Sequence, residues 1–135
     1  MRRSEILNLQ WVDVDLDNGF AFLFDTKNGE DRRVPLTKTA RDVLSKLPNQ
    51  DEIVFPISAN CVRLAWERCR NKAGISDLRF HDLRHEAVSR FFEMGMSVPE
   101  VALISGHKDV RQLFRYTHLN PVSYTHLRAH ETFAN

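Results

Sequence analysis

The sequence predicts an α+β fold, mainly α-helical, with a small three-stranded antiparallel sheet near the N-terminus. Over residues 12–36, apolar and polar residues alternate, and the turn sequences Asp17-Asn18-Gly19 and Asn28-Gly29 divide this stretch into three strands. After residue 37 the apolar residues recur at helical spacing, and capping residues and glycines mark the ends of the helical segments. At 135 residues the chain is long enough to bury one core.

Composition and cysteine usage narrow the class of protein. No apolar run approaches the roughly 20 residues of a membrane span, and no signal peptide opens the chain, so we expect no membrane partner. Cys61 and Cys69 stand eight residues apart and form neither a disulfide framework nor a Cys-x-x-Cys metal motif. This usage favours a reducing, cytoplasmic setting. Basic residues crowd the middle of the chain, where they form a candidate phosphate-binding face.

Helices are expected both before and after the three predicted strands. Residues 1–11 have the apolar spacing of the end of a helix. Thr37 or Thr39 caps a second helix, and Ser58 caps a third that ends at Gly74.

The C-terminal half carries three more expected helices. One spans residues 80–94 and buries a single apolar stripe. The next starts at a capping box, Ser97 with Glu100 three residues later. The last begins at Asp109 and runs to Tyr116. The expected stripe over residues 80–94 consists of Phe80, Leu83, Ala87, Phe91 and Met94.

The sequence His81-Asp82-Leu83-Arg84 is the first candidate for chemistry. Residues i and i+3 share one helix face, so His81 and Arg84 are expected to lie together. A guanidinium binds two oxygens of a phosphate diester and an imidazole moves a proton near neutral pH, although an exposed helix face carries such pairs too. His81 and His85 also have the i, i+4 spacing of a zinc site, but the metalloprotease signature needs Glu where this chain has Asp82.

Other polar residues stand in turns or near element ends. His107 follows the glycine at an expected helix end, and Tyr116 comes nine residues later. Lys27 lies in the turn between two expected strands, and Arg2 precedes Glu5 in the opening helix. Taken singly, each of these patterns is also typical of a structural or solvated residue.

In order and spacing, these residues resemble the tyrosine recombinase family, the phage-type integrases. The opening residues 1–7 are similar to the family's Gly-x-Arg-x-x-Glu-Leu box, with the leading Gly missing and Arg2 as the matching arginine. Lys27 in TKNGEDRRVPL is similar to the family's lysine, which lies in a β-hairpin turn before Val-Pro-Leu. The second box is matched by His81-Asp82-Leu83-Arg84, by LISGH over residues 103–107 and by Tyr116.

The resemblance implies a site-specific DNA recombinase or integrase. Tyr116 would attack a phosphodiester of double-stranded DNA, forming a 3′-phosphotyrosine and releasing a 5′-hydroxyl without a metal or cofactor. His81 would assist removal of the tyrosine proton, which a phenol keeps up to about pH 10. Lys27 would protonate the leaving oxygen, while His85 and Asp82 are assigned to packing and helix capping.

The resemblance also assigns the groups that bind the phosphate. Arg2, Arg84 and His107 would supply positive charge and donors to the non-bridging oxygens, where negative charge develops. Glu5 is expected to orient Arg2. The implied catalytic set is therefore Arg2, Lys27, His81, Arg84, His107 and Tyr116, with no metal site.

The same resemblance implies how the chain is organised. Residues 1–120 are expected to be a catalytic domain lacking its first helices and the family's N-terminal core-binding domain. Residues 121–135 repeat Tyr-Thr-His-Leu and are expected to be a tail, non-native or duplicated. The intact family works as a tetramer on DNA, so other recombinase protomers are expected partners, and this fragment is expected to have low activity alone. We expect a bacterial or phage-derived, nucleoid-associated protein.

The sequence leaves alternatives for the nucleophilic tyrosine and for the function of the protein. Tyr116 stands nine residues after His107 and is the predicted nucleophile, whereas Tyr124 stands seventeen residues after it, on the tail. A catalytically inactive DNA-binding remnant is the main alternative function, and a type IB topoisomerase would use similar chemistry. A zinc protein would use His81, His85, His126 and His130.

Overall fold

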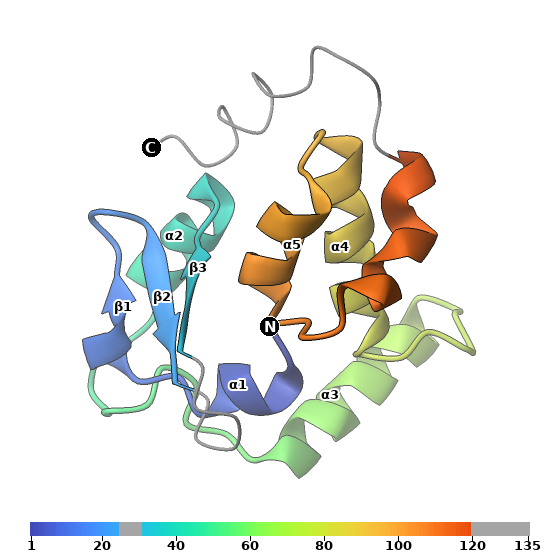
Figure 1. Cartoon of the computed structure of the whole chain (residues 1–135). Coiled ribbons are helices and arrows are strands. Elements are labelled where there is room, and N and C mark those ends of the chain that lie inside the picture. Colours follow the sequence, from blue (N-terminus) through green and yellow to red (C-terminus); the bar gives the residue numbers. More distant parts are fainter. Residues whose placement is uncertain (25–30, 120–135) are drawn as a thin grey trace.

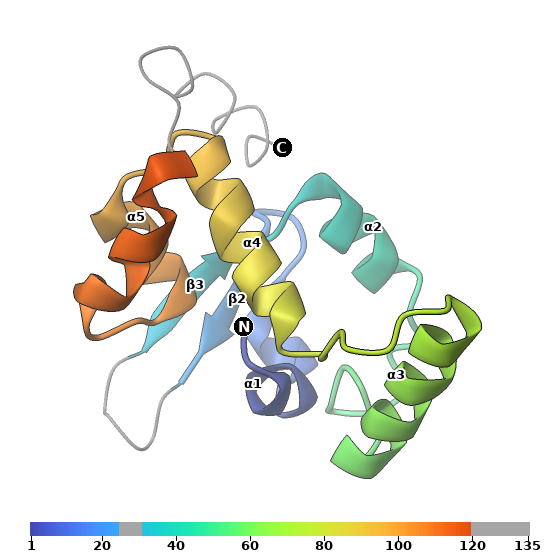
Figure 2. The ribbon, with the colours of Figure 1, turned by 90° about the vertical axis from the view of Figure 1, so that its right-hand side faces the viewer.

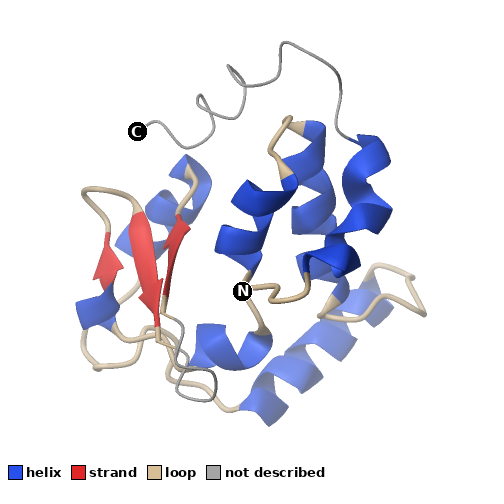
Figure 3. Ribbon diagram, viewed as in Figure 1, coloured by secondary structure: helices blue, strands red, loops and turns tan. Residues whose placement is uncertain are grey.

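The computed structural model describes residues 1–24 and 31–119 (Figure 1). Its elements are α1 Arg3–Leu7, η1 Trp11–Asp13, β1 Val14–Asp15, β2 Phe20–Leu23, β3 Arg32–Pro35, α2 Lys38–Ser45, α3 Ala59–Lys72, α4 Asp82–Glu93, α5 Val98–Ser105 and η2 Val110–Leu119. The sheet and α2 lie on one side, and α4, α5 and the 3₁₀ helix η2 lie on the other (Figures 1 and 3). The predicted α+β class is confirmed. Within the described ranges, no helix is long and apolar enough to cross a membrane.

The sheet is an antiparallel meander in the order β1-β2-β3, as predicted. Ala21 on β2 pairs with Val34 on β3. Ala21, Leu23 and Val34 are buried, whereas Phe22 is exposed. The alternation therefore predicted the strands correctly. On β2 the smaller side chains, Ala21 and Leu23, face the core, and Phe22 faces outward. The Asn-Gly turn predicted between β2 and β3 lies outside the described residues.

Two clusters of buried apolar side chains hold the fold together. The sheet core lies between the sheet and α2, and the helical core lies between α4, α5 and η2. Ile104 on α5 is partly buried and packs against both cores, so it joins them. The sheet core consists of Leu9, Ala21, Leu23, Val34, Leu44 and Val54. The helical core consists of Val88, Phe92, Met96, Val101 and Leu113.

Side-chain caps begin three helices where the sequence predicted them. Thr37, and not Thr39, caps α2, because its Oγ1 accepts a hydrogen bond from a backbone amide in the first turn. Ser58 caps α3 and Ser97 caps α5 in the same way. Helix α5 ends at Gly106, whose φ of 75° lies in the left-handed region that glycine adopts without strain.

The buried face of α4 differs from the predicted stripe. Leu83 is 47% exposed and Ala87 is exposed too, so the stripe expected over residues 80–94 was wrong at these two positions. The buried side chains of α4 are instead Arg84, Val88 and Phe92, which follow one another at intervals of four residues. Because these positions share one helix face, the packing of Val88 and Phe92 in the helical core carries Arg84 toward the interior with them.

Helix α3 is attached to the segment that leads into α4. The Trp66 ring packs edge-on against Phe80 with 5.5 Å between ring centroids. The indole Nε1 of Trp66 donates a hydrogen bond to the carbonyl of Leu78 at 3.0 Å. Figure 2 shows α3 running beneath the start of α4. These contacts therefore hold the beginning of α4 in place.

Leu113→Ala tests whether the helical core carries η2. Leu113 is fully buried, so the truncation should lower the free energy of unfolding by about 2–5 kcal/mol. Leu103→Ala is the matched control, because Leu103 is 73% exposed and its loss should change the free energy by no more than about 0.5 kcal/mol. Urea denaturation followed by circular dichroism measures both, and equal effects would contradict the packing described.

Candidate active site

Arg84 is the one arginine, lysine, aspartate or glutamate that is buried among the described residues, at 8% exposure. Its Nη2 lies 3.5 Å from Nδ1 of His107, in the turn that follows α5. Its Nη1 is buried and has no hydrogen-bond partner in the described part of the chain. A buried donor without a partner carries a large desolvation cost, so an acceptor placed at Nη1 would stabilise the site.

The charges around this guanidinium are mostly positive. Burial does most to lower the pKa of Arg84, and the charges of Arg2 and Arg32 lower it further. Glu5 and Tyr116 act in the opposite direction. The group therefore sits in an excess of positive charge that a bound anion would relieve. The opposing effect of Tyr116 also shows that its phenol is within electrostatic reach of Arg84.

An ion pair between Arg32 and Glu5 joins the elements that build the site. Arg32 Nη2 lies 2.6 Å from Glu5 Oε2, and Arg32 Nε donates to the carbonyl of Ile104 at 3.1 Å. Strand β3, helix α1 and helix α5 are thereby connected. The Arg32 guanidinium also covers Gly106, where an added Cβ would come within 2.7 Å of it. Glu5 accepts a hydrogen bond from the backbone amide of Arg2, but its ion pair is with Arg32.

His107 is a neutral imidazole with its lone pair on Nδ1. Arginine has only protons to donate, so the contact from Arg84 Nη2 requires an acceptor at Nδ1. The Ser105 hydroxyl, 2.6 Å away, donates to the same atom, and the ring proton is therefore on Nε2. Burial, followed by the charges of Arg84 and Arg2, lowers the pKa of His107 to about 4. At neutral pH His107 thus offers a hydrogen-bond donor without a charge of its own.

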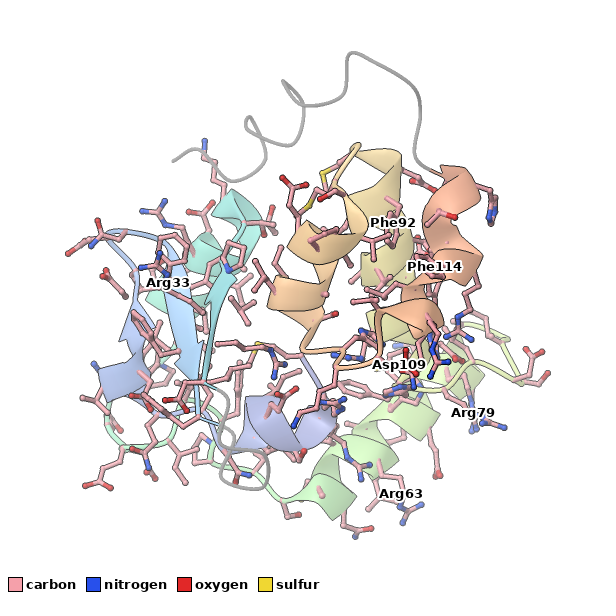
Figure 4. The ribbon with its side chains drawn as sticks, viewed as in Figure 1. Arg33, Arg63, Arg79, Phe92, Asp109 and Phe114 are labelled. Carbon is pink, nitrogen blue, oxygen red and sulfur yellow. The ribbon has the colours of Figure 1, made fainter. Side chains whose placement is uncertain are left out.

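The hydroxyl of Tyr116 lies in a second polar group, next to α4. It is 2.7 Å from His85 Nδ1 and accepts a hydrogen bond from Arg115 Nη2 at 2.8 Å. The Tyr116 ring stacks on Phe92 with 6.2 Å between centroids and 6° between planes, and Phe92 belongs to the helical core (labelled in Figure 4). The Arg115 guanidinium lies over the same ring, 4.8 Å from its centroid. The phenol is therefore held on both its ring and its oxygen.

His81 stands at the start of α4 and is exposed. Its ring lies edge-on to that of His85, with 5.1 Å between centroids. Burial lowers the pKa of His81, and the charges of His85, Arg84 and Arg2 lower it further. His81 therefore belongs to the same electrostatic group as Arg84, but the imidazole on the tyrosine oxygen is that of His85.

The structure gathers most of the predicted catalytic side chains. Tyr116 is held next to α4 through the contact of its hydroxyl with His85, which is a residue of that helix. Lys27 lies outside the described residues, as do Tyr124 and the whole of residues 120–135. The charges of Arg2 and Arg84 lower the pKa of both His81 and His107, so these four predicted residues lie together.

The predicted alternative of a zinc site has no counterpart in the described part of the chain. Residues 1–24 and 31–119 contain no group of three His, Cys, Asp or Glu side chains placed as metal ligands. His126 and His130, which completed the predicted zinc set, lie outside these ranges.

Three polar residues of the site received no catalytic or binding role from the sequence: Arg32, His85 and Arg115. His85 was assigned to packing, yet it contacts the Tyr116 hydroxyl from 31 residues away in the chain. The available signals were weak, since Arg115 directly precedes the tyrosine and His85 directly follows Arg84. Neither position indicates a contact between α4 and η2.

Residues 1–122 match the model of the phage integrase family, a stretch that includes every side chain of this site. The chain belongs to this family. The shufflon-specific DNA recombinase of Escherichia coli is 50% identical to it over 121 residues, which cover 88% of this chain and 32% of the recombinase. The chain spans about a third of the length of the curated relatives that it matches.

Solved structures of integrases and recombinases share the fold. The catalytic domain of bacteriophage HP1 integrase superposes with a TM-score of 0.71 at 25% identity, over 98% of this chain and 74% of that domain. The XerH site-specific recombinase bound to its palindromic difH substrate superposes with a TM-score of 0.72 at 21% identity, over 97% of this chain and 40% of XerH. The small sheet and the helices beside it are thus the arrangement of an integrase catalytic domain.

The neutral state of His107 predicts a loss of stability in acid. An unfolded histidine titrates near pH 6.5 and the folded His107 at about 4, so the unfolded chain binds more protons between these values. The stability that His107 contributes is complete above about pH 6.5 and is lost as the pH falls toward 4. We expect the Tm of the wild type to fall more between pH 7.5 and 4.5 than the Tm of His107→Gln.

His118→Gln is the control for this comparison, because His118 is exposed on η2. Its Tm should follow the wild-type dependence on pH. Identical curves for wild type and His107→Gln would show that burial does not hold the His107 ring neutral.

Proposed function

We propose that this chain is the catalytic part of a site-specific DNA recombinase or integrase, which cuts and rejoins DNA through a 3′-phosphotyrosine. The observation that carries the proposal is the unpartnered buried nitrogen of Arg84 within electrostatic reach of a tyrosine. A phosphodiester supplies the anion that Arg84 lacks and the phosphorus that Tyr116 attacks. We assign this activity to residues 1–120.

Arg84, Arg2 and His107 bind the non-bridging oxygens of the scissile phosphate in this proposal. Arg84 offers its unpartnered Nη1, and His107 offers the proton on Nε2. Negative charge grows on these oxygens as phosphorus becomes five-coordinate, so fixed donors in a buried site stabilise the transition state more than the ground state. His81, at the exposed start of α4, is the residue to which the family resemblance assigns removal of the Tyr116 proton.

Tyr116 is the nucleophile and Lys27 the general acid. The phenolic oxygen bonds to phosphorus, the bond from phosphorus to the 5′ oxygen breaks, and Lys27 gives that oxygen a proton. The phosphotyrosine conserves the energy of the broken bond, so rejoining needs no nucleotide, metal or organic cofactor.

Double-stranded DNA is the proposed substrate. An open groove of about 420 Å³ beside the site is lined by Arg3, Ser4, Arg79, Phe80 and His81. Arg63 and Arg79 project from the same side of the molecule in Figure 4. Such a basic surface binds the DNA backbone, and binding weakens as salt rises. The DNA-bound state of XerH, which has the same fold, supports this substrate.

Other recombinase protomers are the proposed protein partners, assembled as a tetramer on two DNA duplexes. The protein then works on bacterial or phage DNA, in the cytoplasm at the nucleoid. The names of the relatives from Escherichia coli and Salmonella phage P22 support this setting.

Covalent capture of DNA tests the proposal. We would incubate the protein with labelled duplexes that carry a nick beside randomised sequence, so that the 5′ fragment diffuses away and traps the adduct. The wild type should give a protease-sensitive shifted band, and Tyr116→Phe should give none, because a phenyl ring has no nucleophilic oxygen. Sequencing the trapped DNA would define the target site.

Tyr124→Phe is the matched control, since it has the same local Tyr-Thr-His-Leu sequence. It should capture DNA as the wild type does, and peptide mass spectrometry should find the nucleotide adduct on Tyr116. Salt-sensitive DNA binding without any capture would identify the DNA-binding remnant instead. An adduct on Tyr124 would refute the assignment of the nucleophile.

A further inference from the structure

We propose that His85 is the base that takes the proton of Tyr116, and that Arg115 stabilises the phenolate. This inference rests on the proposed function and replaces the role expected of His81. The polar group on the tyrosine oxygen is separate from the one around Arg84, and its members come from α4 and η2. It supplies what the phosphate-binding group does not, namely a proton acceptor in contact with the nucleophile.

The directions of the hydrogen bonds follow from the chemistry of arginine. Arg115 Nη2 lies 3.2 Å from His85 Nδ1 and 2.8 Å from the Tyr116 hydroxyl oxygen. A guanidinium accepts no hydrogen bond, so both of these atoms must be acceptors toward it. Nδ1 of His85 therefore carries a lone pair and no proton. The 2.7 Å contact between the hydroxyl and Nδ1 then has one possible donor, the O–H of Tyr116.

This geometry allows direct transfer of the Tyr116 proton to His85. The acceptor nitrogen is in direct contact with the proton that must leave, within the distance that general-base catalysis requires. Arg115 donates to the oxygen on which negative charge appears, and charge-assisted hydrogen bonds to an oxyanion are the stronger ones. The stack of the Tyr116 ring on Phe92 keeps the phenol in this position.

The groups that face His85 come from both helices. Tyr116 and Arg115 approach it from η2, and His81 lies one turn earlier on α4 with its ring edge-on. The charged form of His85 also lowers the pKa of His107. The hydrogen-bond directions, which leave the lone pair of His85 on Nδ1, therefore make this atom the proton acceptor that a base requires.

The proposed step balances in both directions. In cleavage, the O–H bond of Tyr116 breaks, its proton passes to His85 Nδ1, and the oxygen bonds to phosphorus as the bond to the 5′ oxygen breaks. The 5′ oxygen takes its proton from the general acid, proposed as Lys27. In rejoining, the 5′ hydroxyl returns that proton and attacks phosphorus, while the His85 imidazolium protonates the departing phenolate.

The test measures the rate of covalent capture in a single turnover, with two nicked duplexes of the same sequence. One carries the ordinary 5′ oxygen, and the other carries sulfur at that bridging position, which leaves as a thiolate without needing an acid. At pH 7, His85→Ala should slow capture of both duplexes by roughly 10²- to 10⁴-fold. Raising the pH toward 10, or adding imidazole, should restore much of this rate, because either removes the phenol proton in another way.

Arg115→Gln is a second variant, which keeps the length of the side chain and removes its charge. Without that charge the phenolate is less stable, so we expect slower capture at pH 7 and a rate profile shifted to higher pH. Arg111→Gln is its control, because the Arg111 guanidinium pairs with Asp109 at an exposed position of the same helix. His118→Ala is the matched control for His85→Ala, since His118 is exposed, and both controls should capture at the wild-type rate.

The remaining outcomes separate this inference from the proposed function. If the wild type captures no DNA, the proposed function fails. If it captures DNA and His85→Ala is equally fast, the inference fails alone. Faster capture by His85→Ala would mean that His85 and Arg115 hold the tyrosine back. If neither high pH nor imidazole restores the capture rate of His85→Ala, the role of His85 is structural. Either of these last two results would overturn the inference.

Discussion

The burial of the Arg84 guanidinium is the constraint on which the rest of the site depends. Removing a cation from water costs several kcal/mol unless an anion and hydrogen bonds replace the solvent. Glu5 is the carboxylate that acts on Arg84, yet its own ion pair is with Arg32. Nη1 of Arg84 is left without a partner in the described chain. The fold therefore keeps a positive charge poorly compensated, and the ligand that we propose to offset that cost is a phosphate.

The two cores make such a site possible. Arg32 ties the sheet to α1 and α5 through its contacts with Glu5 and Ile104, while Val88 and Phe92 anchor α4 on the face that carries Arg84. Side chains that must act together are thus mounted on separate elements, each fixed by its own packing. Rigid placement of this kind is what a transition state for phosphoryl transfer requires, because donors that had to reorganise would lose part of their effect.

Local patterns predicted the elements well, because caps and turns depend on neighbouring residues. The caps at Ser58 and Ser97 are examples, and so is the left-handed end of α5 at Gly106. The order of the site residues followed from a family resemblance. The face that α4 buries could not be predicted in this way. A prediction that places apolar stripes in the core does not place an arginine there, yet Arg84 is buried. The contact of His85 with the tyrosine depends on how η2 packs against α4, which no local pattern contains.

The binding of inorganic phosphate tests most directly whether Arg84 binds an anion. The Tm of the wild type and of Arg84→Gln would be measured in phosphate and in chloride at equal ionic strength, so that the general stabilising effect of phosphate cancels between variants. With a dissociation constant of about 10 mM, 100 mM phosphate would stabilise the wild type by about 1.4 kcal/mol, or a few degrees in Tm. The account predicts this extra rise in the wild type and its absence in Arg84→Gln. An equal rise in both proteins would contradict it.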